Sequence, residues 1–196
     1  MRSQVCIVAQ DTFLFSDTIG SNISFGAGDR GTRLEYNGQY DGQRRRRGYD
    51  EQYVRRMAAI AGADGFISSM PDGYDTVVGE RGVGLSGGQK QRLSLARALA
   101  DNPSILIMDD TTSAVDMETE AEIQRHLRDL DEKKTIVTIA HRISSVKDSD
   151  LILVLEHGRI VERGTHDELV ASHGRYWQIY SKQLGVDAGR SQGFEA

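Results

Sequence analysis

The 196-residue sequence lacks the features of a disulfide-bonded or membrane-spanning protein. It holds a single cysteine, Cys6, so no disulfide can form within the chain, and we expect Cys6 to be a small buried residue of a strand. The longest strongly apolar runs, such as residues 151–155, are far shorter than the roughly 20 residues that a membrane-spanning helix needs. No signal-peptide pattern precedes them. Any membrane contact is therefore expected to come through a partner or through a segment outside this sequence.

The chain also lacks a net positive charge and a phosphate-binding loop. The net charge of −5 argues against a general nucleic-acid binder, because phosphate backbones attract basic protein faces. We therefore expect no nucleic-acid partner. No copy of the pattern G-x-x-x-x-G-K-[ST] occurs, since every lysine follows a residue other than glycine. The hydrophobic content of 38% is nevertheless enough for a chain of this length to bury a core.

The most informative stretch is LSGGQKQRLSLARALADNPSILIMDDTTSAVD, which covers residues 85–116. Ser86, Gly87 and Gly88 stand directly before a predicted helix over residues 89–100. A serine cap and two residues without side chains leave backbone N–H groups open at the start of that helix. Such a helix start is a binding site for anions.

Two carboxylates follow the next predicted element. Residues 105–108 form a short apolar run, typical of a strand that is covered on both faces of a parallel sheet. Asp109 and Asp110 come at its carboxyl end, which is the edge where open α/β sheets bind their ligands. Paired acids at that edge can hold a metal ion and handle a water molecule.

LSGGQ followed by an apolar strand, paired acids and TTSAVD resembles the nucleotide-binding domain of an ABC transporter. Either half alone could equally be a glycine turn before a helix or an ordinary strand cap. The resemblance runs from about residue 5 to about residue 183. It implies an α/β fold, with a P-loop NTPase-type, mainly parallel sheet and an inserted helical subdomain. In that family the first strands and the Walker A loop precede Gln10, so these parts are expected to be missing here.

The resemblance also implies the cofactors ATP and Mg²⁺ and a set of site residues. Gln10, which opens QDTFLFSDTIGSNI, matches the Q-loop glutamine that approaches Mg²⁺ and the attacking water. His141 in TIAHR matches the switch histidine that senses the γ-phosphate. Asp109 is expected to hold Mg²⁺ through water, and Asp116 to link the two ATP sites. The residues expected to close over ATP held by a partner are Ser86, Gly87, Gly88 and Gln89.

Asp110 departs from the family pattern, because competent members carry glutamate after the Walker B aspartate. The carboxylate is kept, but its arm is one methylene shorter. A misplacement of about 1 Å in a catalytic group can cost on the order of 100-fold in rate. Asp110 is therefore expected to stand in weakly for the general base. Exporters with one weak and one competent site resemble this pattern, and in them two different chains pair.

The division expected from the sequence begins with a core strand and Q-loop in residues 1–25. A helical subdomain with a surface insertion and the signature motif follows in residues 26–104. Residues 105–184 carry Walker B, the D-loop and the switch histidine, and residues 185–196 form a tail. The arginine run 44–47 is typical of a solvated loop, with contact to anionic lipid headgroups as the alternative. The GERG segment, residues 79–82, resembles a loop of ABC exporters.

Further elements are expected along the chain. Strands are predicted over residues 5–9 and 135–140, with a strand pair over 151–155 and 159–162. Helices are predicted over 118–130 and 176–184, and Thr165 with Glu168 predicts a capping box. Phe13, Leu14 and Phe15 would be a costly exposed patch unless a protein surface covers them.

The resemblance implies the ATP-hydrolysing domain of an ABC exporter at the cytoplasmic face of the cell membrane. Its expected partners are a second ABC ATPase domain and the transmembrane domains, and the isolated chain is expected to be inactive. One alternative is a non-catalytic or degenerate module that only completes the partner's ATP site. Another is a soluble ABC-type ATPase of DNA repair, which the GERG segment disfavours.

Overall fold

The computed structural model describes residues 4–10, 12–30, 50–79, 82, 84–130 and 134–185, with the side chains of residues 28–30 excepted. The chain divides into two compact units, residues 1–139 and 140–196, and each is described by itself. The arginine run and the middle of GERG, Glu80 and Arg81, lie outside the described residues. The predicted domain boundaries stay a prediction.

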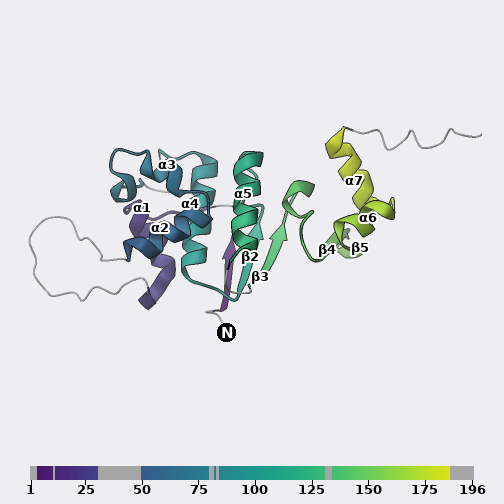
Figure 1. Ribbon diagram of the computed structural model, residues 1–196, viewed down its shortest axis with the longest axis horizontal. Helices are drawn as coiled ribbons and strands as arrows, with labels where there is room; N and C mark the ends of the chain where they lie inside the picture. Colours follow the sequence, from purple (N-terminus) through teal and green to yellow (C-terminus); the bar gives the residue numbers. More distant parts are fainter. Residues whose placement is uncertain are drawn as a thin grey trace, which may run out of the picture. The chain divides into compact units, whose positions relative to one another are not determined.

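Unit 1 combines one small sheet with a group of helices (Figure 1). Its strands form a parallel sheet in the order β1-β2-β3, with Ile7 opposite Ile107 and Ile107 opposite Val137. In chain order the elements are β1 (Val5–Val8), α1 (Ile19–Ser24), η2 (Phe25–Arg30), α2 (Glu51–Ile60), α3 (Asp64–Ser68), η3 (Gly73–Asp75), α4 (Gly87–Ala100), β2 (Ile105–Asp109), α5 (Met117–Arg128) and β3 (Thr135–Ile139).

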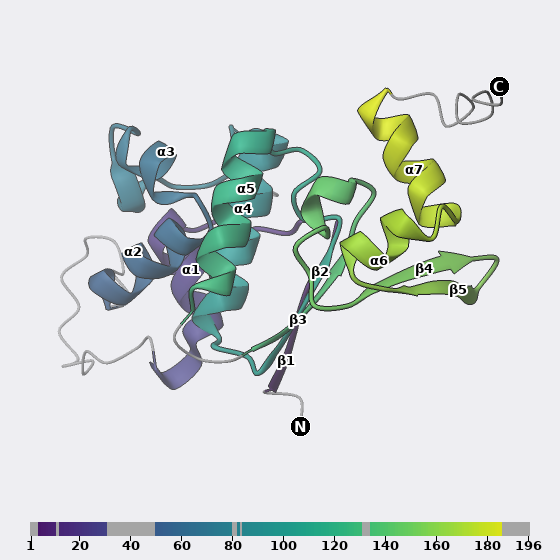
Figure 2. The same cartoon turned by 45° about the vertical axis from the view of Figure 1, so that its right-hand side comes forward.

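The core of unit 1 lies between the helices and one face of this sheet. Leu106 and Met108 of β2 are buried in the same cluster as side chains from α4 and α5, which lie beside the sheet in Figure 2. On the opposite face Ile7 is 63% exposed, Val137 44% and Ile139 50%. Coverage on both faces was predicted for residues 105–108, and this is wrong for the described residues, because Ile105 and Ile107 of β2 stay partly exposed. The reason is that alternate strand residues point to opposite faces, and the described helices contact one of them.

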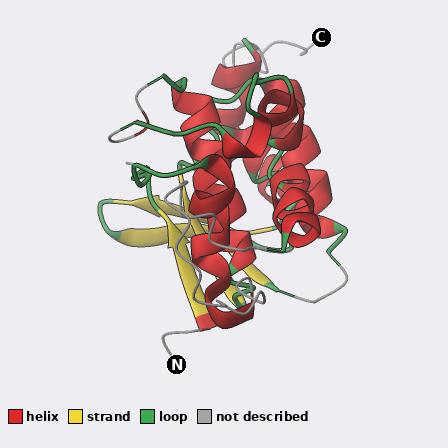
Figure 3. Ribbon diagram, turned by 90° about the vertical axis from the view of Figure 1, so that its left-hand side faces the viewer, coloured by secondary structure: helices red, strands yellow, loops and turns green. Residues whose placement is uncertain are grey.

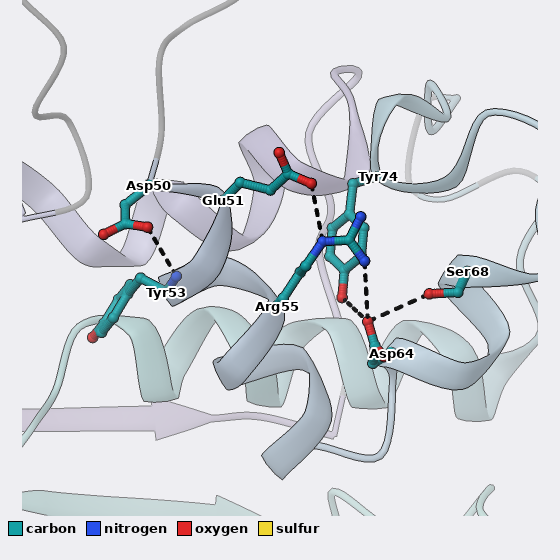
Figure 4. Close-up of polar contacts among 7 residues, drawn as sticks. All are labelled: Asp50, Glu51, Tyr53, Arg55, Asp64, Ser68 and Tyr74. Carbon is teal, nitrogen blue, oxygen red and sulfur yellow. Dashed lines mark hydrogen bonds and ion pairs between the residues drawn. The ribbon is translucent and has the colours of Figure 1, made fainter.

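Helices α2 and α3 are braced by a polar cluster, drawn in Figure 4. Asp50 accepts the backbone N–H of Tyr53 at 3.0 Å and so caps α2. Arg55 lies 3.0 Å from Glu51 and 3.8 Å from Asp64, while its guanidinium lies over the ring of Tyr74. The phenol of Tyr74 donates to Asp64 at 2.6 Å. These contacts tie α2, α3 and η3 into one helical group.

Unit 2 is a strand pair covered by two helices. Strands β4 (Ile152–Glu156) and β5 (Arg159–Gly164) form the predicted strand pair, antiparallel around a turn at His157 and Gly158, where φ is 49° and 75°. Helices α6 (His166–Ala171) and α7 (Arg175–Leu184) follow, with a short η5 (Ile143–Ser145) before the strands. The capping box of Thr165 and Glu168 is confirmed at the start of α6. Figure 3 separates helix from strand by colour.

Within the described residues, no helix combines the length and the apolar character that crossing a membrane requires.

Candidate functional site

The start of α4 has the capped geometry that its sequence predicts. The backbone N–H of Gln89 donates to Oγ of Ser86 at 3.2 Å, and the N–H of Ser86 donates to Oε1 of Gln89 at 2.9 Å. This reciprocal capping box starts the helix at Gly87, two residues earlier than predicted. The N–H of Gln89 is therefore used by the Ser86 hydroxyl. At Gly87 and Gly88 no side chain shields the backbone.

Gly88 is also the point at which α4 approaches the loop after β2. A Cβ at Gly88 would lie 2.6 Å from the carbonyl oxygen of Ala114, so only glycine allows this approach. A Cβ at Gly87 would meet Cβ of Ala114 at an ordinary 3.5 Å. The two glycines thus differ: Gly88 is required by packing, whereas Gly87 has room for a side chain.

Asp109 and Asp110 lie at the carboxyl end of β2, as predicted. Asp109 is the last strand residue and pairs in register with Ile139. The backbone of Asp110 leaves the strand with φ of 47°, and its N–H donates to the carbonyl of Ile139 at 2.9 Å. Both carboxylates are partly exposed, so ligands and water can reach them.

Gln10 reaches this pair of acids from the neighbouring strand. It follows β1 and is exposed, and its Nε2 lies 3.5 Å from Oδ2 of Asp110. The parallel pairing of β1 with β2 brings the two strand ends to the same edge of the sheet. The structure therefore brings together Gln10 and Asp110, two of the residues expected to act on one water molecule.

The loop from Asp110 to Asp116 is held from several sides. Oγ1 of Thr111 donates to the carbonyl of Val8 at 3.3 Å, and Oγ1 of Thr112 donates to the buried carboxylate of Glu120 at 2.6 Å. Asp116 caps α5 by accepting the N–H of Thr119 at 2.9 Å. That backbone hydrogen bond, with a second one from the Thr119 hydroxyl, lowers the pKa of the Asp116 carboxyl.

His141 belongs to unit 2 and is described with that unit. Its side chain is exposed, and its carbonyl accepts a hydrogen bond from Nε2 of Gln183 at 2.8 Å. The other amide atom of Gln183, Oε1, accepts the N–H of Ile143 at 2.9 Å. Gln183 thus fixes the backbone around His141, a role that the sequence did not suggest.

The donor set fits Mg²⁺ bound together with a nucleotide. Among the described residues no group of three or more histidine, cysteine, aspartate or glutamate side chains is placed to hold a metal ion. Magnesium is usually held by one or two carboxylates plus waters and substrate phosphates, so an all-protein cage is not required. Asp109, Asp110 and the amide oxygen of Gln10 are oxygen ligands of the kind that it prefers.

Two further features near the site were missed from the sequence. Phe25 joins the exposed patch of Phe13 and Phe15, with ring centroids 5.3 Å apart for Phe13–Phe15 and 4.7 Å for Phe15–Phe25. Gln91 is 6% exposed and hydrogen-bonds to the loop after β2. A signal for Gln91 was present, because it lies one turn before Leu95 on the buried face of α4.

Comparison with known proteins gives matches to ABC transporter proteins. The family model described as "ABC transporter" matches residues 1–113. An uncharacterised ABC transporter ATP-binding protein, YknU of Bacillus subtilis, is 49% identical over 93% of this chain and 28% of its own length. The ATP-dependent lipid A-core flippase of Photobacterium profundum is 43% identical over 94% of this chain and 28% of its own. A putative multidrug export ATP-binding/permease protein of Staphylococcus aureus is 46% identical, with 93% and 28% covered.

A solved structure confirms the predicted fold class. The bacterial Atm1-family ABC exporter with ATP bound superimposes with a TM-score of 0.77 at 42% identity. The match covers 93% of this chain and 29% of that one. The chain therefore spans less than a third of the length of these relatives and has the α/β, P-loop NTPase-type fold. Because the family model matches more than half of its residues and these relatives share 42–49% of theirs, the chain belongs to the ABC transporter family.

Proposed function

We propose that this chain is the ATP-binding and ATP-hydrolysing domain of an ABC exporter, acting with Mg²⁺ at the cytoplasmic face of the cell membrane. The contact between Gln10 and Asp110 carries the proposal, because it places an amide and a carboxylate around one position at the ligand-binding edge of the sheet. The exporter relatives support it. The partners are a second ABC ATPase domain and the transmembrane domains.

Each site residue has a distinct role in this proposal. Asp109 holds Mg²⁺ through water, and Gln10 orients the attacking water beside it. Asp110 acts as a weak general base, since its arm is short. His141 senses the γ-phosphate. The residues that act between the two ATP sites are Ser86, Gly87, Gly88 and Gln89, which close over the partner's ATP, and Asp116, which links the sites.

A groove of about 560 Å³ in unit 1 supports the transmembrane partner. Phe13 is 54% exposed, Phe15 37% and Phe25 59%, and all three line the groove. Arg97 lies under them: its Nη2 donates to the carbonyl of Phe13 at 2.5 Å, and its guanidinium is 5.7 Å from the Phe15 ring. Three neighbouring exposed aromatic rings are the type of surface that a partner protein covers.

The alternative function is a nucleotide-binding module that completes the partner's site without hydrolysing ATP itself. The observation that favours it is the short arm of Asp110 in place of glutamate. Both functions use the start of α4. They differ in whether the site on this chain hydrolyses ATP.

The test uses the complete exporter that carries this chain as an ATPase domain, reconstituted in lipid vesicles. The proposed function predicts Mg²⁺-dependent ATP hydrolysis that falls when Asp109 is changed to asparagine, because the metal ligand is lost. Glu118→Asn, at an exposed position in the first turn of α5, is the control. Turnover unaffected by Asp109→Asn would favour the non-hydrolysing module, and no turnover in any variant would count against both.

A further inference from the structure

A buried glutamine joins the signature helix to the loop that carries Asp110. Gln91 donates from Nε2 to the carbonyl of Asp110 at 3.4 Å and to Oγ of Ser113 at 3.2 Å. Its Oε1 accepts the N–H of Ala114 at 3.1 Å. Both ends of the amide are therefore used on one loop, and a buried amide without these partners would be destabilising.

A second contact lies on the same face of α4. Gly88 is three residues before Gln91, so the two face the same neighbour across the helix surface. The backbone of Gly88 approaches the carbonyl of Ala114 so closely that a Cβ would come within 2.6 Å of it. Helix α4 is thus docked on the loop at two points, one through packing and one through hydrogen bonds.

Gln91 differs from the other side chains that anchor this loop. Thr111 and Thr112 tie the loop to β1 and α5, which do not belong to the signature segment. Gln91 reaches the backbone of Asp110 itself from the helix that begins with Ser86, Gly87 and Gly88. Because groups in contact inside a close-packed interior tend to move together, this hydrogen bond gives α4 a direct connection to the backbone of Asp110.

Resting on the proposed function, we propose that Gln91 is a positioning residue that couples the two ATP sites of the exporter. Closure of the α4 start over the partner's ATP moves α4, and Gln91 transmits this to Asp110 in the chain's own site. Coupling between two sites needs a physical connection between them. Here the connection is the set of hydrogen bonds from Gln91 to Asp110, Ser113 and Ala114.

The first experiment measures hydrogen exchange in the complete exporter, in the peptide covering residues 110–116. Gln91→Met keeps the length of the side chain and removes its hydrogen bonds. Exchange should rise by about 5- to 10-fold, as expected for the loss of one protecting hydrogen bond. Gln91→Glu keeps the acceptor for the Ala114 N–H and should show a smaller rise. Gln52→Met, at an exposed position of α2, should match the wild type.

The second experiment follows ATP turnover against ATP concentration. The wild type should show a Hill coefficient above 1, and Gln91→Met should bring it to about 1. The maximal rate should fall roughly 10-fold with half-saturation little changed, whereas general destabilisation would leave the Hill coefficient intact. Unchanged exchange in Gln91→Met would overturn the positioning role, and an unchanged Hill coefficient would overturn the coupling. A wild type without turnover would count against the proposed function instead, while the exchange measurement would still decide the role of Gln91.

Discussion

The amide nitrogen Nε2 of Gln10 lies 3.5 Å from Oδ2 of Asp110, although the two residues are 100 positions apart in the sequence. The register of the sheet sets this contact, because Val8 of β1 pairs with Met108 of β2 and the two parallel strands end at the same edge of the sheet. The length of the side chain at position 110 therefore decides how far its carboxylate reaches from the end of β2 toward the Gln10 amide.

Lengthening Asp110 to glutamate should raise ATP turnover of the complete exporter by up to about 100-fold, because the longer arm restores the reach to the attacking water. Steady-state hydrolysis in vesicles measures this. Asp110→Asn removes the charge and should leave little turnover at this site. If Asp110→Glu still binds nucleotide but hydrolyses ATP at the wild-type rate, the length of the side chain does not limit the site.

Gly87→Asp should reduce hydrolysis at the partner's site by at least about 100-fold, since one preorganised donor is worth roughly 2.7–4 kcal/mol and the new carboxylate repels phosphate. Gly87→Ala should fold normally, because its Cβ meets Ala114 at 3.5 Å. Photolabelling of each chain by a nucleotide analogue separates the sites. Loss of labelling on this chain alone would show that the loop serves its own site.

The isolated 196-residue chain should bind MgATP only in the millimolar range or more weakly. The physical reason is that the sequence has no G-x-x-x-x-G-K-[ST] pattern, the loop that supplies donors to the α- and β-phosphates. Titration calorimetry on the purified chain is the measurement. Micromolar affinity would reveal a different phosphate site.

Glu162→Ala should lower the free energy of unfolding of unit 2 by about 1–2 kcal/mol. The carboxylate accepts the N–H groups of Arg175 at 2.5 Å and Tyr176 at 2.9 Å, and Gly174 offers no side-chain cap to α7. Urea unfolding measures the change. Glu156→Ala is the control, since this partly exposed carboxylate forms a surface ion pair with the Arg175 side chain at 3.4 Å and should cost under about 0.5 kcal/mol.

Protonation of Asp116 should destabilise the start of α5 in acid. Because the hydrogen bond from Thr119 lowers the folded-state pKa of Asp116, its stabilisation is complete above the unfolded pKa of about 3.9. This stabilisation is lost as the pH falls through the lower pKa that Asp116 has in the folded state. Thermal unfolding from about pH 6 to pH 2.5 should therefore show a smaller acid slope in Asp116→Asn than in Glu118→Gln. Equal slopes would contradict the assignment.

The elements that local chemistry determines could be predicted from the sequence. The cap at Ser86, the strand before Asp109 and the turn at His157 all follow from the residues themselves, and the structure differs by one or two residues at the ends. The family resemblance, carried by short motifs of adjacent residues, was confirmed by comparison for the same reason.

The contacts that depend on tertiary arrangement could not be predicted. The position of Gln91 on the apolar face of α4 indicates that it is buried, but it does not show that its amide bonds to a loop about twenty residues later, since helix, turn and strand must all be placed first. Phe25 likewise reaches Phe15, with ring centroids 4.7 Å apart, only once α1 between them has folded. The exposed face of the sheet was missed because an apolar run looks the same whether one face is covered or both.

The left-handed backbone at Asp110 bears on how this site can evolve. With φ at 47°, the residues that fit most easily are glycine, asparagine and aspartate. Two of these three carry no carboxylate. The fold therefore accepts residues without an acid at position 110, so the local backbone does not by itself require a carboxylate there.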